Sequence, residues 1–318
     1  MRDKATAIVA IAGTGLIGRA WAVAFARGGC DVRLYDSQDG AAESALTAVE
    51  DMAEELHRAD MLGGATVADL VARASVSETL EAALACADHV QESIPERVEI
   101  KRAFYALLDD LAEPEAILAS STSALLPSAF TEGLRTRHRC VVAHPINPPS
   151  LIPAVEIVPA PWTDPAAVER CAQLMEQIGQ KPIRMKKEID GFIMNRLQGA
   201  LLQEAFRLVE DGVASPDDVD IGIAYGLAPR WALMGPFETI DLNAPGGVAD
   251  YVDRYGGMYA NIGKSQGRMP EWSGALLDRV TKARRYVLPL DGIADSQSRR
   301  DKRLMALMRH LRDTNTDE

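Results

Sequence analysis

The chain has few cysteines, no long hydrophobic run and no excess of basic residues. Its four cysteines are scattered through 318 residues without a CxxC pair, which argues against disulfides or a metal site and favours a reducing, cytoplasmic setting. The longest apolar runs fall well short of the roughly 18 residues that a membrane-spanning helix needs. A formal net charge of −12 argues against nucleic acid or an anionic membrane as a partner.

Two kinds of pattern divide the chain near residue 188. Before this point, short apolar runs alternate with helical segments, and a helix-rich acidic stretch is expected at 40–85. After it, nearly every segment has helical period. We therefore predict an α/β domain with a mostly parallel, doubly wound sheet over 1–188 and an all-α domain over 189–318. Among the expected strands are 7–12, 30–36, 139–143, 152–158 and 182–187.

A glycine-rich loop lies between the first predicted strand and the first predicted helix. Its sequence, GTGLIG, matches the pattern GxGxxG. In such a loop the first glycine allows a tight turn, the second lets a pyrophosphate approach the backbone, and the third lets helix and strand pack closely. The helix N-terminus then faces the negative phosphates. The pattern predicts a dinucleotide site that includes Gly13, Gly15, Leu16, Ile17 and Gly18.

Asp36 ends the next predicted strand, 18 residues after Gly18. A carboxylate at this point can accept hydrogen bonds from both hydroxyls of the adenosine ribose and would repel a 2′-phosphate. Arg33, three residues earlier on the strand, should point to the opposite side and leave this repulsion in place. These residues predict NAD, not NADP, as the cofactor; the alternative is a structural glycine turn beside a surface aspartate.

The stretch HPINPPSLIPAVE holds a histidine and a glutamate at its two ends. His144 follows a predicted strand, at the edge where open α/β sheets bind their ligands. If the chain reverses at 148–150, His144 and Glu156 are equally far from residue 150, and their side chains share one face. Such a pair suits the oxidation of an alcohol, because histidine takes the proton and the carboxylate orients its ring. The spacing permits this pair without requiring it. The remaining histidines have helical or charged surroundings and are predicted to be structural or superficial: His57, His89, His138 and His310.

Longer segments extend these patterns over nearly the whole chain. They are, in order, GTGLIGRAWA, QESIPERVEIK, ASSTSALLPS, HPINPP, PAVEIVP, KEIDGFIMNRLQ and GLAPRWALMGPFETIDLN. Together they resemble the 3-hydroxyacyl-CoA dehydrogenase superfamily, and more closely its lambda-crystallin / L-gulonate 3-dehydrogenase branch. The resemblance implies a Rossmann domain that binds NAD and a helical domain that forms a homodimer.

The resemblance also implies roles for individual residues. His144 would be the general base and Glu156 its orienting carboxylate, while Ser123 and Asn195 would hydrogen-bond the substrate oxygen. Glu96 and Lys101 would hold the ribose on the nicotinamide side of the cofactor. Taken without the family, Ser123 reads as a turn-capping serine and Asn195 as a helix-surface asparagine. The pair Glu96 and Lys101 reads equally well as a solvated helix pair.

The substrate is predicted from two departures from the acyl-CoA members. Those members typically carry an aromatic residue after the histidine, where this chain has Pro145, and lack the arginine that precedes MGPFE here, Arg230. An arginine can hold a carboxylate by two parallel hydrogen bonds. We therefore expect a small polar 3-hydroxy acid such as L-gulonate. The alternatives are a 3-hydroxyacyl-CoA ester, L-carnitine and a crystallin-like structural role without turnover.

Overall fold

The structure is a computed structural model that describes residues 6–314, so the ends of the expected domains, 1–5 and 315–318, lie outside the described residues. It contains two compact units. The first comprises the described residues up to 193 together with 302–314, and the second comprises 194–301. The expected assignment of the whole segment 189–318 to the helical domain is therefore corrected. Helix α14 (Ile293–Thr314) belongs to the second unit only as far as residue 301, and its Met305 is buried in the core of the first unit.

The first unit is built on one eight-stranded sheet with the order β3-β2-β1-β4-β5-β6-β7-β8. Strands β1 to β6 run parallel, whereas β7 pairs antiparallel with β6 and β8 runs parallel to β7. This confirms the predicted mostly parallel, doubly wound sheet. The strands are β1 (Ile8–Ala12), β2 (Asp31–Tyr35), β3 (Ala74–Val76), β4 (His89–Glu92), β5 (Ile117–Ser120), β6 (Cys140–Pro145), β7 (Ala154–Pro159) and β8 (Lys181–Arg184).

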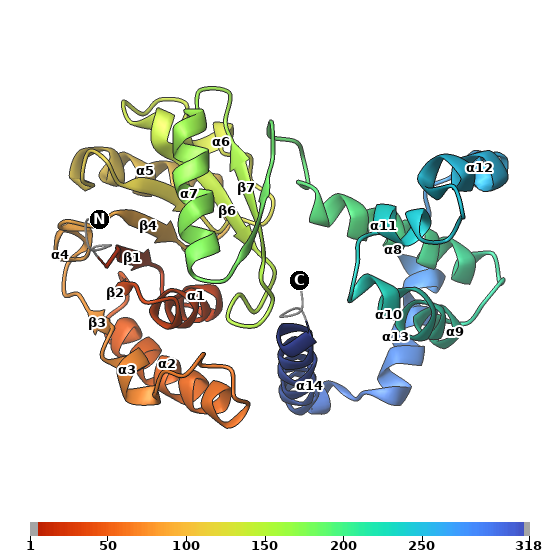
Figure 1. Ribbon diagram of the computed structural model, residues 1–318, viewed down its shortest axis with the longest axis horizontal. Coiled ribbons are helices and arrows are strands. Elements are labelled where there is room, and N and C mark those ends of the chain that lie inside the picture. Colours follow the sequence, from red (N-terminus) through yellow and green to blue (C-terminus); the bar gives the residue numbers. More distant parts are fainter. Residues whose placement is uncertain (1–5, 315–318) are drawn as a thin grey trace. The chain divides into compact units, whose positions relative to one another are not determined.

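Helices cover both faces of this sheet (Figure 1). Alternate residues of a strand point to opposite sides, so each face has its own cluster of buried side chains. On one side, Ile11 of β1 and Ile157 of β7 pack in a core cluster with residues of the helices α1, α2 and α7. On the other side, Val90 of β4 and Val142 of β6 pack with residues of α4, α5 and α6. These helices are α1 (Leu16–Arg27), α2 (Ala41–Arg58), α3 (Val67–Val71), α4 (Leu80–Leu84), α5 (Val98–Leu111), α6 (Ser128–Thr131) and α7 (Pro165–Gln177).

The second unit consists of helices joined by turns, with no strand within residues 194–301. Ser215 and Asp218 form a capping box at the start of its second helix, which satisfies backbone amides that have no partner within the helix. Within residues 6–314, none of the helices is both long and apolar enough to cross a membrane. The helices of this unit are α8 (Met194–Glu210), α9 (Pro216–Ile221), α10 (Ala228–Trp231), α11 (Pro236–Asp241), α12 (Gly247–Ser265), α13 (Gly274–Val287) and the start of α14.

Candidate active site

His144 and Glu156 face each other across the antiparallel pair β6 and β7. The register pairs the two residues directly, which places the centre of the reversal at residue 150, an arrangement that the spacing permitted without requiring it. His144 Nδ1 lies 2.7 Å from Glu156 Oε2, and the two residues are 4% and 0% exposed. A carboxylate only accepts hydrogen bonds, so Nδ1 is the donor in this pair and Nε2 is the ring nitrogen that remains for exchange of a proton with a substrate.

A short segment before α8 completes the surroundings of this pair. The backbone N–H of Ile193 donates to Glu156 Oε1 at 2.6 Å, and the ring of Phe192 lies 5.5 Å from the His144 ring. Gly191 and Phe192 both have positive φ angles, +76° and +51°, an uncommon conformation for a residue as bulky as phenylalanine. The sequence analysis missed this contact, although the glycine in KEIDGF marks the bend that makes it.

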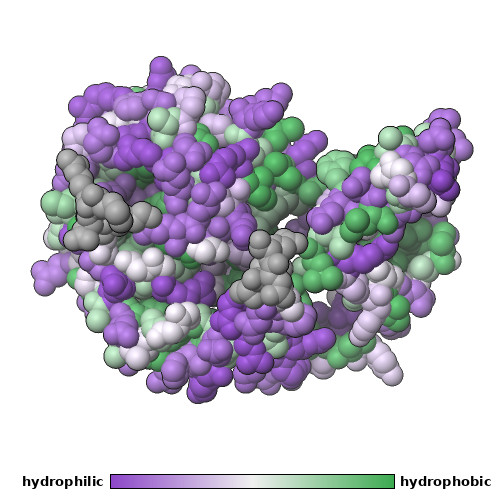
Figure 2. Space-filling model, viewed as in Figure 1, coloured by the Kyte–Doolittle hydropathy of each residue, from purple (hydrophilic) through white to green (hydrophobic). Residues whose placement is uncertain are grey.

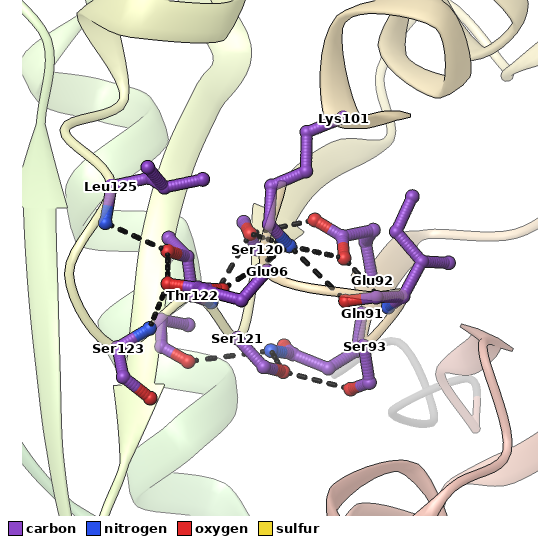
Figure 3. Close-up of polar contacts among 12 residues, drawn as sticks. Gln91, Glu92, Ser93, Glu96, Lys101, Ser120, Ser121, Thr122, Ser123 and Leu125 are labelled. Carbon is purple, nitrogen blue, oxygen red and sulfur yellow. Dashed lines mark hydrogen bonds and ion pairs between the residues drawn. The ribbon is translucent and has the colours of Figure 1, made fainter. Parts of the chain in front are cut away.

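Glu96 and Ser123 are brought together at the carboxyl ends of β4 and β5 (Figure 3). Glu96 Oε1 accepts hydrogen bonds from the backbone N–H groups of Ser123 and Ala124, at 3.0 and 3.1 Å, and from Thr122 Oγ1. The Thr122 hydroxyl in turn accepts from the N–H of Leu125. The glutamate therefore fixes the loop that presents Ser123, whose side chain lies at the surface.

Lys101 is buried, so its interpretation as part of a solvated helix pair with Glu96 is wrong. Its Nζ lies 2.7 Å from Oε1 of Glu92, a residue that the sequence analysis did not single out, and 3.8 Å from Glu96 Oε2. Ser120 Oγ donates to the second oxygen of Glu92 at 2.6 Å. Burial raises the pKa of Glu92, and the ammonium of Lys101 opposes this rise. Glu92 thus joins β4, α5 and β5 beneath the loop that carries Ser123.

The glycine loop has the shape that a dinucleotide requires. Gly13 has a φ of +89°, and a Cβ there would lie 2.7 Å from the backbone of Ser93, at the start of the loop that follows β4. A Cβ on Gly18 would lie 1.9 Å from the carbonyl oxygen of Gly13. A Cβ on Gly15 would meet no atom of residues 6–314 within 4 Å. The loop is therefore closed on the side of the sheet and open at Gly15, where a pyrophosphate can approach.

Asp36 lies beside the glycine loop. Its Oδ2 accepts hydrogen bonds from the N–H and the hydroxyl of Thr14, at 2.7 and 3.0 Å, and its Oδ1 accepts from Gln38 N at 3.1 Å. Arg33 instead donates to the carbonyl oxygens of Ala82 and Ala85. Asp36 therefore adds a negative charge next to the loop, while the guanidinium of Arg33 is engaged elsewhere.

The other two predicted site residues belong to the helical unit. Asn195 is the second residue of α8, and Arg230 is an exposed residue of α10. The first unit thus contains the pairs His144–Glu156, Glu96–Ser123 and Asp36–Thr14, and the helical unit contains Asn195 and Arg230.

His89, interpreted from the sequence as structural or superficial, is buried on β4. Burial lowers its pKa from 6.5 to about 4. Between pH 6.5 and about 4 the unfolded chain binds a proton at His89 that the folded chain does not. The free energy of unfolding should therefore fall as the pH falls, by about 1.4 kcal/mol per pH unit and about 3 kcal/mol in total.

We expect His89→Gln to flatten the pH dependence of the unfolding free energy over this range. Urea unfolding from pH 7 to 4 measures it, with His57→Gln on α2 as the matched control; a slope equal to that of the wild type would contradict a neutral His89.

The chain matches the family models for two domains of one enzyme. The model described as 3-hydroxyacyl-CoA dehydrogenase, NAD binding domain, matches residues 8–189, and the one described as 3-hydroxyacyl-CoA dehydrogenase, C-terminal domain, matches residues 191–284. Lambda-crystallin from Oryctolagus cuniculus is 42% identical over 317 residues, covering 98% of this chain and 99% of that protein. An L-carnitine dehydrogenase from a Pseudomonas species is 35% identical, with coverages of 93% and 91%.

A solved structure has the same fold over nearly the whole length. It is an NAD⁺-dependent dismutase, 5-formyl-3-hydroxy-2-methylpyridine 4-carboxylic acid 5-dehydrogenase, and it matches with a TM-score of 0.82 at 27% identity. The match covers 96% of this chain and 98% of that one. The open glycine loop and the carboxylate beside it fit the NAD that the family's first domain binds. The chain therefore belongs to the 3-hydroxyacyl-CoA dehydrogenase family and is an NAD-dependent oxidoreductase.

Proposed function

We propose that this protein oxidises the 3-hydroxyl group of a small free hydroxy acid, of the L-gulonate type, to the 3-keto acid. The observation that supports this most strongly is the buried His144–Glu156 hydrogen bond at the carboxyl end of β6. It engages Nδ1 and holds the ring by a carboxylate, so that Nε2 is the nitrogen that can take up a hydroxyl proton.

In this proposal His144 Nε2 takes the hydroxyl proton, and Glu156 stabilises the imidazolium that forms. Bound NAD supplies the hydride acceptor. The hydroxyl of Ser123 and the amide of Asn195 donate hydrogen bonds to the substrate oxygen and orient it.

The cofactor is assigned to the glycine loop and the carboxylates near it. The open backbone at Gly15, with Leu16 and Ile17 at the start of α1, holds the pyrophosphate, and Asp36 accepts from the adenosine ribose. Glu96 is the exposed partner on the nicotinamide side, with 43% of its side chain accessible. The buried ammonium of Lys101 lies 3.8 Å from Oε2 of this carboxylate and adds a positive charge beside it.

A free acid is preferred as the substrate because of Arg230 and Pro145. The related L-carnitine dehydrogenase and the pyridine-carboxylate dehydrogenase are both named for substrates that carry a carboxylate. A bidentate guanidinium–carboxylate pair would hold such a group.

Arg230→Met should raise KM for the hydroxy acid by about 10- to 100-fold, because a hydrogen bond to a charged group contributes about 1.5–3 kcal/mol. The KM for NAD should stay close to that of the wild type. Initial rates of NADH formation measure both constants. Arg254→Met removes an exposed arginine that pairs with Asp250 in the same unit and serves as the control. An unchanged KM for the acid in Arg230→Met would contradict the assignment.

A panel of four substrates tests the proposed function directly. NADH formation is followed with L-gulonate, 3-hydroxybutyrate, L-carnitine and 3-hydroxybutyryl-CoA, and L-gulonate is expected to give the highest kcat/KM. Activity with the CoA ester alone would overturn the free-acid proposal.

L-carnitine is the second candidate because of the related L-carnitine dehydrogenase. A cage for its trimethylammonium group would need aromatic side chains such as Tyr225, Trp231 and Phe237, which are exposed in the helical unit.

We also propose that the helical unit forms a homodimer. Apolar side chains lie on its surface, coloured green in Figure 2, and residues 252, 255, 259 and 262 of α12 form an exposed stripe at helical spacing. Large exposed apolar areas mark association surfaces. Light scattering after size exclusion should give about twice the chain mass of 34.4 kDa. Replacing Val252 and Tyr259 with lysine should shift the mass to that of one chain, whereas a single-chain mass for the wild type would contradict the dimer.

A further inference from the structure

Gln91 is a fully buried polar side chain in the middle of the sheet, with no part in the reaction proposed above. Val90, the residue before it on β4, packs on the side of α4 and α5. Gln91 and His89 therefore point to the opposite side, where the His89 ring lies 5.6 Å from Phe25 of α1.

The amide of Gln91 reaches across strand β5 to strand β6. Its partner in the register on β5 is Ala119, whose methyl group leaves room for the longer side chain to pass. Nε2 donates to the hydroxyl of Ser121 at 2.7 Å (Figure 3). It also donates to the carbonyl oxygen of Ala143 at 3.3 Å. The paired residues of β5 and β6 end at Ser120 and Val142. Gln91 therefore supplies a donor just beyond the last strand pair.

The two groups that Gln91 binds belong to the segments that carry the candidate site. The Ala143 carbonyl is part of the peptide unit that joins Ala143 to His144, so the hydrogen bond fixes the backbone plane at the base. Ser121 precedes Ser123 by two residues, and its hydroxyl also contacts the hydroxyl of Ser93, 2.9 Å away, in the loop after β4. Gln91 therefore links the carboxyl ends of β4, β5 and β6. It does so on the face of the sheet opposite to the one that carries the His144 side chain.

The Ala143 carbonyl determines which way this amide points, and His89 receives the other end of it. The Ala143 carbonyl can only accept, so Nε2 of Gln91 must face it, and Oε1 must face His89 Nε2, 3.0 Å away. His89 Nε2 is then the donor, which makes the ring the Nε2–H tautomer; among residues 6–314 its Nδ1 has no hydrogen-bond partner. With an acceptor on one side and this N–H donor on the other, the amide satisfies both contacts in one orientation only.

We propose that Gln91, held in one orientation between the Ala143 carbonyl and His89, is a positioning residue that sets the placement of His144 and Ser123 for proton transfer. The inference rests on the proposed function of His144. It assigns Gln91 no contact with substrate or cofactor, and it requires that loss of the amide affects the chemical step more than binding.

The test compares Gln91→Met, which keeps the length and removes the donors, with Gln91→Asn, which keeps an amide too short to reach β6. Both should lower kcat by about tenfold or more, because a misplacement of about 1 Å can cost two orders of magnitude. The Kd for NADH should stay within about twofold of the wild-type value. Thr163→Val is the matched control, since it removes a hydroxyl that donates to the Cys140 carbonyl at the other end of β6; its kcat should stay near that of the wild type.

Hydrogen–deuterium exchange separates this inference from the proposed function, because it requires no substrate. The backbone amides of residues 142, 143, 144 and 146 should exchange faster in both Gln91 variants and at the wild-type rate in Thr163→Val. If the wild type oxidises none of the four substrates, the proposed function fails while the exchange result still decides whether Gln91 holds the strand end. A Gln91→Asn protein with wild-type kcat and wild-type exchange would overturn the inference, as would a loss of kcat no greater than that of Thr163→Val.

Discussion

His144→Gln is expected to lower kcat by about 10²- to 10⁴-fold, the range that a general base contributes. Glutamine can still donate a hydrogen bond to Glu156, but it has no nitrogen that takes up a proton near neutral pH. The Kd for NADH, measured by fluorescence titration, should remain close to that of the wild type. His138→Gln replaces an exposed histidine of the same unit and is the control. A His144→Gln protein with wild-type kcat would remove His144 from the mechanism.

Glu156→Gln tests the same mechanism from the carboxylate side, and the structure fixes which way its amide must turn. The N–H of Ile193 points at Oε1, so the carbonyl oxygen of the new amide accepts it and the NH₂ group faces His144. Nδ1 of the histidine must then accept, which puts the ring proton on Nε2. The base is blocked in this tautomer, and kcat should fall by a similar factor. A small effect of Glu156→Gln beside a large effect of His144→Gln would mean that the carboxylate does not determine the tautomer.

The His144–Glu156 pair could be recognised in the sequence as one permitted arrangement, because it depends on local features. Proline and serine residues at 148–150 set where the chain reverses, and strand periodicity then places two residues at equal distances from that point on one face. The glycine loop could be predicted because its sequence pattern lies within one strand–turn–helix unit, where Gly18 packs against the Gly13 carbonyl; the close approach of Gly13 to Ser93 in the loop after β4 could not.

The buried partners of the site could not be predicted because they depend on strands that are distant in sequence. Lys101 looks like a solvated residue of an amphipathic helix until β5 brings Ser120 beside Glu92. His89 and Gln91 likewise gain their roles from Ala143, more than 50 residues away. Strand β3 has only three residues, too few to show the alternation that marks a strand. Residues 302–314 belong to the first unit because Met305 is buried in its core. The charged residues around Met305 give no sign of this burial in the sequence.

Lys101→Met is expected to lower the free energy of unfolding by about 3–5 kcal/mol, because it leaves the carboxylate of Glu92 buried without a counter-charge. Urea unfolding measures the loss. Arg184→Met is the control, since it breaks exposed ion pairs with Glu169 and Glu176 and should change stability by only about 1 kcal/mol.

The loss in Lys101→Met should also depend on pH in a defined direction. Burial already raises the pKa of Glu92, and removal of the ammonium raises it further. The folded variant then binds a proton more tightly than the unfolded chain, so its stability should recover as the pH falls towards the range in which free glutamate titrates. The double variant Lys101→Met/Glu92→Gln carries no buried charge and should regain most of the lost stability at neutral pH. If the double variant were as unstable as Lys101→Met, the loss would come from packing around α5 and not from an unpaired carboxylate.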